Sequence, residues 1–123
     1  MRLLLDTHVL IWWDAGEPLS KRAARTIRDA DQVYVSSVTG WEIAVKAALG
    51  KIETTRDVRD AVADSGFEEL PVRLYHAQVL ASLPLHHRDP FDRMLVAQAA
   101  AEELTLVTRD RTLGRYGVKV LPA

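Results

Sequence analysis

The sequence predicts a single α/β domain of three layers, in which helices cover both faces of a central parallel sheet. Short apolar runs alternate with helical segments along the chain, which is the pattern of strands joined by crossover helices. The runs are apolar at consecutive positions, as expected of strands that are buried on both faces. The 123 residues are enough for one core and too few for two, so we expect one domain over residues 1–123.

The first half of the chain predicts two strands and three helices. Runs of branched apolar residues mark strands at 3–5 and 33–35, and weaker helical patterns cover 7–13 and 20–30. A clearer helix is predicted over 39–49, with Gly50 placed as its C-terminal cap. Its apolar positions recur at helical spacing, namely Trp41, Ala44, Val45, Ala48 and Leu49.

The second half predicts three helices and two further strands. Weak helical patterns cover 56–63 and 74–83. A helix over 90–104 is better defined, because Asp89 is placed as its N-cap and Pro90 as its first residue. This helix is apolar nearly all round, so we expect it to be buried. Strands are predicted at 105–108 and 118–121.

Composition and charge limit the functions that the chain can have. The apolar fraction of 48% and charged fraction of 27% are those of an ordinary globular protein. The formal charge of −1 provides no global attraction for nucleic acid, so any such binding needs a local basic patch. The absence of cysteine excludes disulfides and thiolate metal sites. No apolar run approaches the ~20 residues of a membrane span, and Asp6 interrupts the N-terminal leucines, so we expect a cytoplasmic protein.

Four acidic residues are predicted to meet at one edge of the sheet. Asp6 and Asp110 follow strands, while Glu42 and Asp92 fall in the first turns of helices. Each could be a helix cap by itself, and Glu42 also fits a capping box with Thr39 or an ion pair with Lys46.

Convergence of these acids at the carboxyl ends of parallel strands favours a metal site over four separate caps. Two unit charges about 4 Å apart repel by roughly 4 kcal/mol at an effective dielectric of 20, so clustered carboxylates bind a proton or a cation. All-oxygen ligands indicate Mg²⁺ or Mn²⁺ rather than zinc. The adjacent His86 and His87 are assigned to a loop, and His8 is expected to pack beside the first strand.

Hydroxyl and basic side chains near these acids are candidates for supporting roles. Thr7, Ser36 and Thr108 lie at the same predicted strand ends, where they could bond the acids, a phosphate or simply the backbone. The local basic patch that nucleic-acid binding requires is assigned to Lys46, Arg88, Arg93 and Arg109, although ordinary surface charges would give the same pattern.

Four segments of the chain resemble the four acidic motifs of PIN-domain proteins, and more narrowly those of VapC, the toxin of VapBC toxin–antitoxin systems. The segments lie in order along the whole chain, at residues 3–8, 36–44, 87–95 and 106–110. By motif, the four acids are Asp6, Glu42, Asp92 and Asp110. Asp89 also belongs to the third motif, and Asp92 is assigned there because Asp89 is well explained as a helix cap.

The resemblance implies a Mg²⁺- or Mn²⁺-dependent endoribonuclease that cleaves RNA by metal-activated water, commonly as a homodimer, and that a small VapB-type antitoxin neutralises. Asp6, Asp92 and Asp110 are then expected to hold one or two metal ions, with Glu42 completing the site. Two alternatives stay open. One is a non-catalytic PIN-like module that binds RNA or protein. The other is a haloacid-dehalogenase-like phosphatase, whose expected second aspartate is replaced here by His8.

Overall fold

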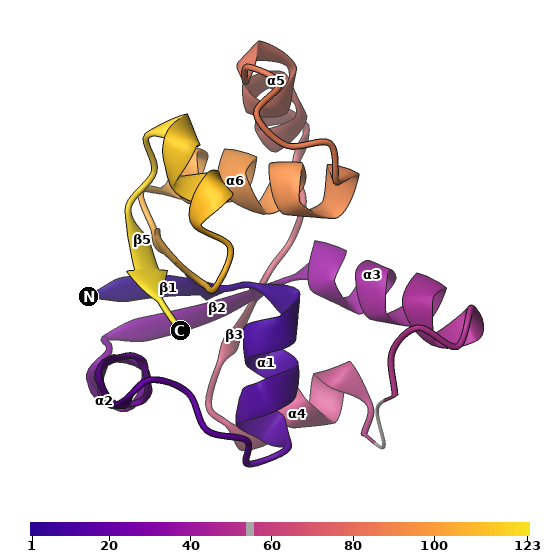
Figure 1. The fold of residues 1–123 in the computed structure, drawn as a ribbon, viewed down its shortest axis with the longest axis vertical. Helices are drawn as coiled ribbons and strands as arrows, with labels where there is room; N and C mark the ends of the chain where they lie inside the picture. Colours follow the sequence, from indigo (N-terminus) through magenta and orange to yellow (C-terminus); the bar gives the residue numbers. More distant parts are fainter. Residues whose placement is uncertain (54–55) are drawn as a thin grey trace.

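Five parallel strands form the centre of the molecule, in the order β3-β2-β1-β4-β5 (Figure 1). This computed structural model describes residues 1–53 and 56–123. The strands are β1 (Arg2–Leu5), β2 (Gln32–Ser36), β3 (Glu68–Leu70), β4 (Thr105–Thr108) and β5 (Val120–Pro122). The helices are α1 (Thr7–Asp14), α2 (Lys21–Asp29), α3 (Ser37–Ala48), α4 (Val58–Asp64), α5 (Leu74–Ser82), α6 (Pro90–Glu102) and the 3₁₀ helix η1 (Arg111–Tyr116).

Two apolar clusters, one on each face of the sheet, form the core. Side chains alternate across a strand, so Leu3 and Leu5 of β1 enter one cluster and Leu4 enters the other. The first cluster also receives α1, α2 and α4, and the second receives α6 and η1. Figure 1 shows these two groups of helices on opposite sides of the sheet, with α5 packed outside α6. All three leucines are fully buried, which explains why the run is apolar at consecutive positions. The predicted three-layer parallel fold is confirmed.

The strand β3 was not predicted from the sequence. It lies at the edge of the sheet and pairs only with β2. Two of its three residues, Glu68 and Glu69, are exposed acids, and only Leu70 is buried. Glutamate is depleted in strands. A three-residue edge strand with two glutamates therefore carries almost no apolar signal.

The helix α3 begins earlier and buries a different face than predicted. Ser36 is its N-cap and accepts a hydrogen bond from the backbone N–H of Val38. The capping box considered for Thr39 and Glu42 is therefore not formed, because both residues lie inside the helix and are buried. The periodic apolar positions that predicted this helix, Trp41, Ala44, Val45, Ala48 and Leu49, are exposed.

The helix α6 agrees closely with its prediction. Asp89 is its N-cap and accepts hydrogen bonds from the backbone N–H groups of Phe91 and Asp92. The middle of the helix is buried from Leu95 to Ala99, as its apolar character implied. Across residues 1–53 and 56–123, no helix is both long and apolar enough to span a membrane.

Candidate active site

The four predicted acids line a single cavity at the carboxyl ends of β1 and β4. The chain order of the strands reverses between these two neighbours, and ligands of open parallel sheets bind at such a point. Asp6 follows β1 directly and Asp110 lies two residues beyond β4, while α3 and α6 supply Glu42 and Asp92. The cavity has a volume of about 250 Å³ and is lined by Asp6, His8, Trp12, Glu42, Lys46, Asp89, Asp92, Arg109 and Asp110.

Asp6 is fixed by hydrogen bonds to both of its carboxylate oxygens. Its Oδ1 accepts the backbone N–H groups of His8 at 2.8 Å and of Val9 at 3.5 Å, which makes it the N-cap of α1. Its Oδ2 accepts the hydroxyl of Thr108 at 2.6 Å. The Thr108 oxygen in turn accepts the backbone N–H of Asp110 at 3.0 Å. Thr108 therefore ties the first acid to the loop that carries the fourth.

Glu42 is the most deeply buried acid, with 2% of the residue exposed. Its Oε1 accepts the Thr7 hydroxyl at 2.6 Å, and Thr7 also lies 3.2 Å from the Thr39 hydroxyl. Its Oε2 accepts Lys46 Nζ at 2.5 Å, so the predicted ion pair is confirmed. The hydrogen bond to Glu42 is the largest cause of the raised pKa of Lys46, and the charges of Asp89 and Asp92 raise it further.

Asp92 carries the least compensated negative charge of the cluster. Its pKa is raised from 3.8 to about 7, first by burial and then by the charges of Asp89, Asp6 and Glu42, with His87 acting in the opposite direction. Among the residues placed by the structure, its carboxylate accepts no hydrogen bond, and its ion-pair partner is His87 at 3.6 Å. A nearby cation would lower this pKa, because it stabilises the charged form of the carboxylate.

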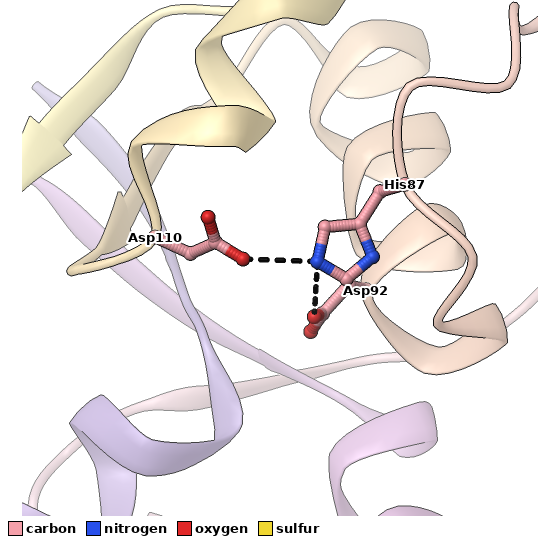
Figure 2. Close-up of side chains that lie close together, drawn as sticks. All are labelled: His87, Asp92 and Asp110. Atoms are coloured by element: carbon pink, nitrogen blue, oxygen red, sulfur yellow. Dashed lines mark hydrogen bonds and ion pairs between the residues drawn. The ribbon is translucent and has the colours of Figure 1, made fainter.

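Asp110 has an oppositely shifted pKa because it is well supplied with donors. Its Oδ1 accepts the hydroxyl of Thr112 at 2.6 Å and the backbone N–H of Thr112 at 3.0 Å, which caps η1. Its Oδ2 lies 3.0 Å from Nε2 of His87. Hydrogen bonding by Thr112 is the main cause that lowers the pKa of Asp110, and His87 adds to it. Figure 2 shows the His87 ring between Asp110 and Asp92.

The donor set fits a hard divalent cation. Carboxylate oxygens from the residue after β1, from α3, from α6 and from the loop after β4 line one cavity, and no thiol is available. Two of the lining acids, Asp92 and Asp110, form a group with the neighbouring His87, in which each residue offers one ligand-type atom within 4.8 Å of the others. The pKa of Asp92 is raised by its burial and, in addition, by the charges of Asp89, Asp6 and Glu42, which a divalent cation would offset.

The predicted basic and hydroxyl residues are only partly brought to this cavity. Lys46 and Arg109 line it, and the Arg109 guanidinium lies 3.9 Å from the ring centre of Trp12. Thr7 and Thr108 bond two of the acids directly. The cavity is therefore acidic at its base, with two cations and an indole ring at its walls.

Ser36, Arg88 and Arg93 lie elsewhere. Ser36 caps α3 and lines a different cavity, between α3 and α4. Arg93 donates to the Pro84 carbonyl at 2.9 Å and to the Tyr116 hydroxyl at 3.1 Å, so it holds the chain before α6 against η1. Arg88 is exposed and does not line the acidic cavity.

Two histidines lie in surroundings that the sequence did not predict. His8 does not pack beside β1: it is exposed at the rim of the cavity, with its ring 5.8 Å from that of Trp12. His87 lies among the acids, although its adjacency to His86 had assigned it only to a loop. One local signal was available in the sequence. His87 lies two residues before Asp89, and a side chain at this spacing can accept a hydrogen bond from the backbone N–H of the turn, which fixes its ring near α6.

Comparison with known proteins places the chain in one family. The PIN domain family matches residues 3–119. Ribonuclease VapC22 of Mycobacterium tuberculosis (strain ATCC 25618 / H37Rv) is 31% identical over 116 residues, which are 90% of this chain and 88% of that protein.

Solved structures of VapBC toxin–antitoxin proteins contain the same fold. The VapBC2 complex of Rickettsia felis, bound to a DNA fragment from its promoter, superposes with a TM-score of 0.75 at 15% identity, and covers 99% of this chain and 98% of the other. VapBC-5 of Mycobacterium tuberculosis, a member of the VapBC family of toxin–antitoxin systems, gives a TM-score of 0.64 at 24% identity, with coverage of 99% and 98%.

Proposed function

The chain belongs to the PIN domain family, in its VapC group, and from this premise we propose that it is a Mg²⁺- or Mn²⁺-dependent endoribonuclease that acts as the toxin of a type II toxin–antitoxin system. The observation that carries the proposal is the convergence of Asp6, Glu42, Asp92 and Asp110 on one cavity at the strand ends. The 31% identity to a protein named as a ribonuclease supports the choice of substrate.

The hydrogen bonds of each acid indicate whether it would bind the metal ion or orient water. Asp92, Asp6 and Asp110 would hold the ion, and Asp92 is the freest to do so because its carboxylate lacks a hydrogen bond from the described residues. Glu42 is engaged by Thr7 and Lys46, so it would complete the negative field of the site and help orient water. When bound, the ion would activate water for attack on the phosphorus and offset the charge that builds on the phosphate.

The basic residues at the walls would bind the RNA strand. Lys46 and Arg109 lie beside the acids and can pair with phosphates on either side of the scissile one. The indole of Trp12 supports the Arg109 guanidinium, whose Nη2 also donates to the Pro18 carbonyl at 3.0 Å. Such contacts position a strand without reading its sequence.

Replacement of Asp6 by Asn tests the proposal. The amide keeps an oxygen that can cap α1, so Asp6→Asn should remain folded while losing a negative ligand. We expect a fall of at least about 100-fold in Mg²⁺-dependent cleavage of a single-stranded RNA, the scale on which catalytic electrostatics operate. Asp29→Asn, at the exposed end of α2, is the matched control. Full activity in Asp6→Asn, or cleavage that survives chelation of the metal, would refute the assignment.

A VapB-type antitoxin is the proposed protein partner. The superposition on VapBC complexes over almost the whole chain supports this partner. RNA and such an antitoxin meet in the cytoplasm, so we expect the protein to act there. The protein encoded immediately upstream should co-purify with this chain and inhibit its RNA cleavage. Its failure to inhibit would remove the antitoxin from the proposal without affecting the nuclease site.

A homodimer is the proposed assembly. Trp41, Val45 and Leu49 form an exposed apolar stripe along α3, which we call the α3 stripe. Aromatic and aliphatic side chains in one contiguous row are typical of protein interfaces. The stripe lies on the helix that carries Glu42, so a second copy there would border the acidic cavity.

A non-catalytic PIN-like module is the second candidate. It would keep the fold and the partner while some acids had lost their role. The presence of all four acids on one cavity argues against it, because clustered carboxylates repel one another unless a proton or a cation compensates them. The match to the PIN family favours either candidate over the haloacid-dehalogenase-like phosphatase.

A further inference from the structure

His87 lies within the acidic cluster, where the proposed function has given it no role. Its Nε2 is 3.0 Å from Oδ2 of Asp110 and 3.6 Å from Oδ2 of Asp92 (Figure 2). The ring therefore joins an acid of α6 to the acid that follows β4. By position alone, Nε2 could be a nitrogen ligand of the ion or a donor that fixes the two carboxylates.

The other ring nitrogen decides between these two roles. The backbone N–H of Asp89 donates to Nδ1 of His87 at 3.1 Å. A backbone N–H can only donate, so Nδ1 must present its lone pair and the ring proton must be on Nε2. A nitrogen that carries a proton has no lone pair for a metal. His87 is thus held as an Nε2–H donor for as long as the Asp89 contact lasts.

A second histidine of the same chain shows this arrangement at a distance from the cavity. The Nδ1 of His76 accepts the backbone N–H of Arg73 at 2.9 Å, and its Nε2 lies 3.1 Å from a carboxylate oxygen of Glu102. There the ring closes the first turn of α5 and fixes an acid of α6. Two histidines are thus bonded in the same way, to a backbone N–H through Nδ1 and to a carboxylate through Nε2.

We propose that His87 is a positioning residue of the metal site, which fixes the Asp110 carboxylate by donating from Nε2 and is not itself a ligand. This inference rests on the proposed function. With Thr112 bonded to Oδ1 and His87 bonded to Oδ2, Asp110 has a set orientation toward the cavity. Donors that orient metal-binding carboxylates typically change metal affinity 10- to 100-fold, so about that effect is expected here.

Binding of Mg²⁺ and of Mn²⁺ to the full chain, measured by calorimetry with each metal alone, tests this role. His87→Ala should weaken both metals by a similar factor of about 10 or more. His87→Gln should stay within about 3-fold of the wild type, because its amide N–H can donate to Asp110 from nearly the same place. His76→Ala is the matched control, since it removes the equivalent ring away from the cavity. Thermal unfolding in EDTA checks that each variant folds.

The opposite outcomes would overturn the proposal. If His87 were a ligand, both variants would lose affinity, and the loss would be larger for Mn²⁺, which accepts imidazole more readily than Mg²⁺ does. Unchanged affinity in His87→Ala would equally exclude a positioning role.

Imidazole ¹⁵N spectra give a readout that does not depend on metal affinity or activity. We expect His87 to be protonated on Nε2 and not on Nδ1, both in EDTA and in saturating Mg²⁺. Loss of the Nε2 proton when Mg²⁺ is added would identify a ligand and refute the proposal. If the wild-type chain bound neither ion, the proposed function would fail, while the spectrum in EDTA would still decide whether His87 is a donor.

Discussion

The surroundings of the Asp92 side chain indicate that the site binds a cation. It is half-buried beside three other carboxylates, and the described part of the chain gives it no hydrogen-bond donor. Asp6 and Asp110 have three donors each, and Glu42 has a hydroxyl and an ammonium. Of these four acids, Asp92 alone lacks a hydrogen-bond donor from the described residues. We therefore propose that its carboxylate is the main ligand of the cation.

Replacement of Asp92 by Asn should stabilise the metal-free protein at alkaline pH. Because the folded-state pKa is raised from 3.8 to about 7, the native state binds this proton more tightly than the unfolded chain does. The contribution of Asp92 to stability is therefore most favourable below pH 4 and is lost as the pH rises to 7. Since one pKa unit corresponds to about 1.4 kcal/mol, the loss has an upper bound of roughly 4 kcal/mol.

Urea unfolding in EDTA measures this effect. Asp92→Asn should raise the free energy of unfolding by about 1–3 kcal/mol at pH 8 and change it little at pH 4. Asp29→Asn should show no such pH dependence. A variant that is less stable than the wild type at pH 8 would mean that Asp92 is already compensated in the metal-free chain.

The positions of the acids in the fold could be predicted from the sequence, but their hydrogen-bond partners could not. Asp6 and Asp110 could be located because a residue that ends a parallel strand must lie at a known edge of the sheet. The bonds from Thr108 to Asp6 and from His87 to Asp110 span 102 and 23 residues, so no local pattern contains them. Thr39 and Glu42 matched a capping box, but Ser36 is the N-cap of the helix. The side chains of Thr39 and Glu42 instead form hydrogen bonds with the Thr7 hydroxyl.

Among the elements, α3 shows why helical periodicity can mislead. The apolar side chains at helical spacing correctly predicted a helix, yet they are the exposed face. The buried face instead contains Thr39 and Glu42, which bond across to α1. Periodicity identifies an apolar stripe, but it does not say whether this chain or another molecule covers it.

The end of α6 offers a test of local backbone strain. Glu103 has φ of +55° and is exposed, so its conformation is one that only glycine adopts without cost. Glu103→Gly should raise the free energy of unfolding by about 0.5–1 kcal/mol. The control Ala100→Gly, at an exposed position inside the same helix, should lower it by roughly 1 kcal/mol. Chemical denaturation of both variants measures the two effects, and a destabilised Glu103→Gly would contradict the account of this cap.

For the molecule as a whole, the strand order creates the site. Because β1 lies between β2 and β4, segments that are about 100 residues apart in sequence end side by side. Alternation of strands and helices was enough to predict the parallel sheet and the edge at which the four acids meet. The order of the strands was not predicted, since each strand carries the same apolar signal whichever neighbour it has.

The α3 stripe predicts how the whole molecule assembles. Val45→Lys places a charge in the middle of the stripe at a position that is already 37% exposed, so the fold should tolerate it. We expect the wild type to sediment as a dimer and Val45→Lys to shift toward the monomer. Ala47→Lys, also on α3 and exposed but outside the stripe, should remain dimeric. A dimeric Val45→Lys, or a monomeric wild type, would contradict the proposed interface.

In this proposal the four acids form a single site for a divalent cation. Calorimetric titration of the chelator-treated protein with Mg²⁺, compared between the wild type, Asp6→Asn and Asp29→Asn, tests it most directly. We predict saturable binding to the wild type and to Asp29→Asn, and affinity at least 10-fold weaker in Asp6→Asn, in line with the loss of a charged ligand. Wild-type protein that takes up no Mg²⁺, or Asp6→Asn that binds it as well as the wild type does, would contradict the claim.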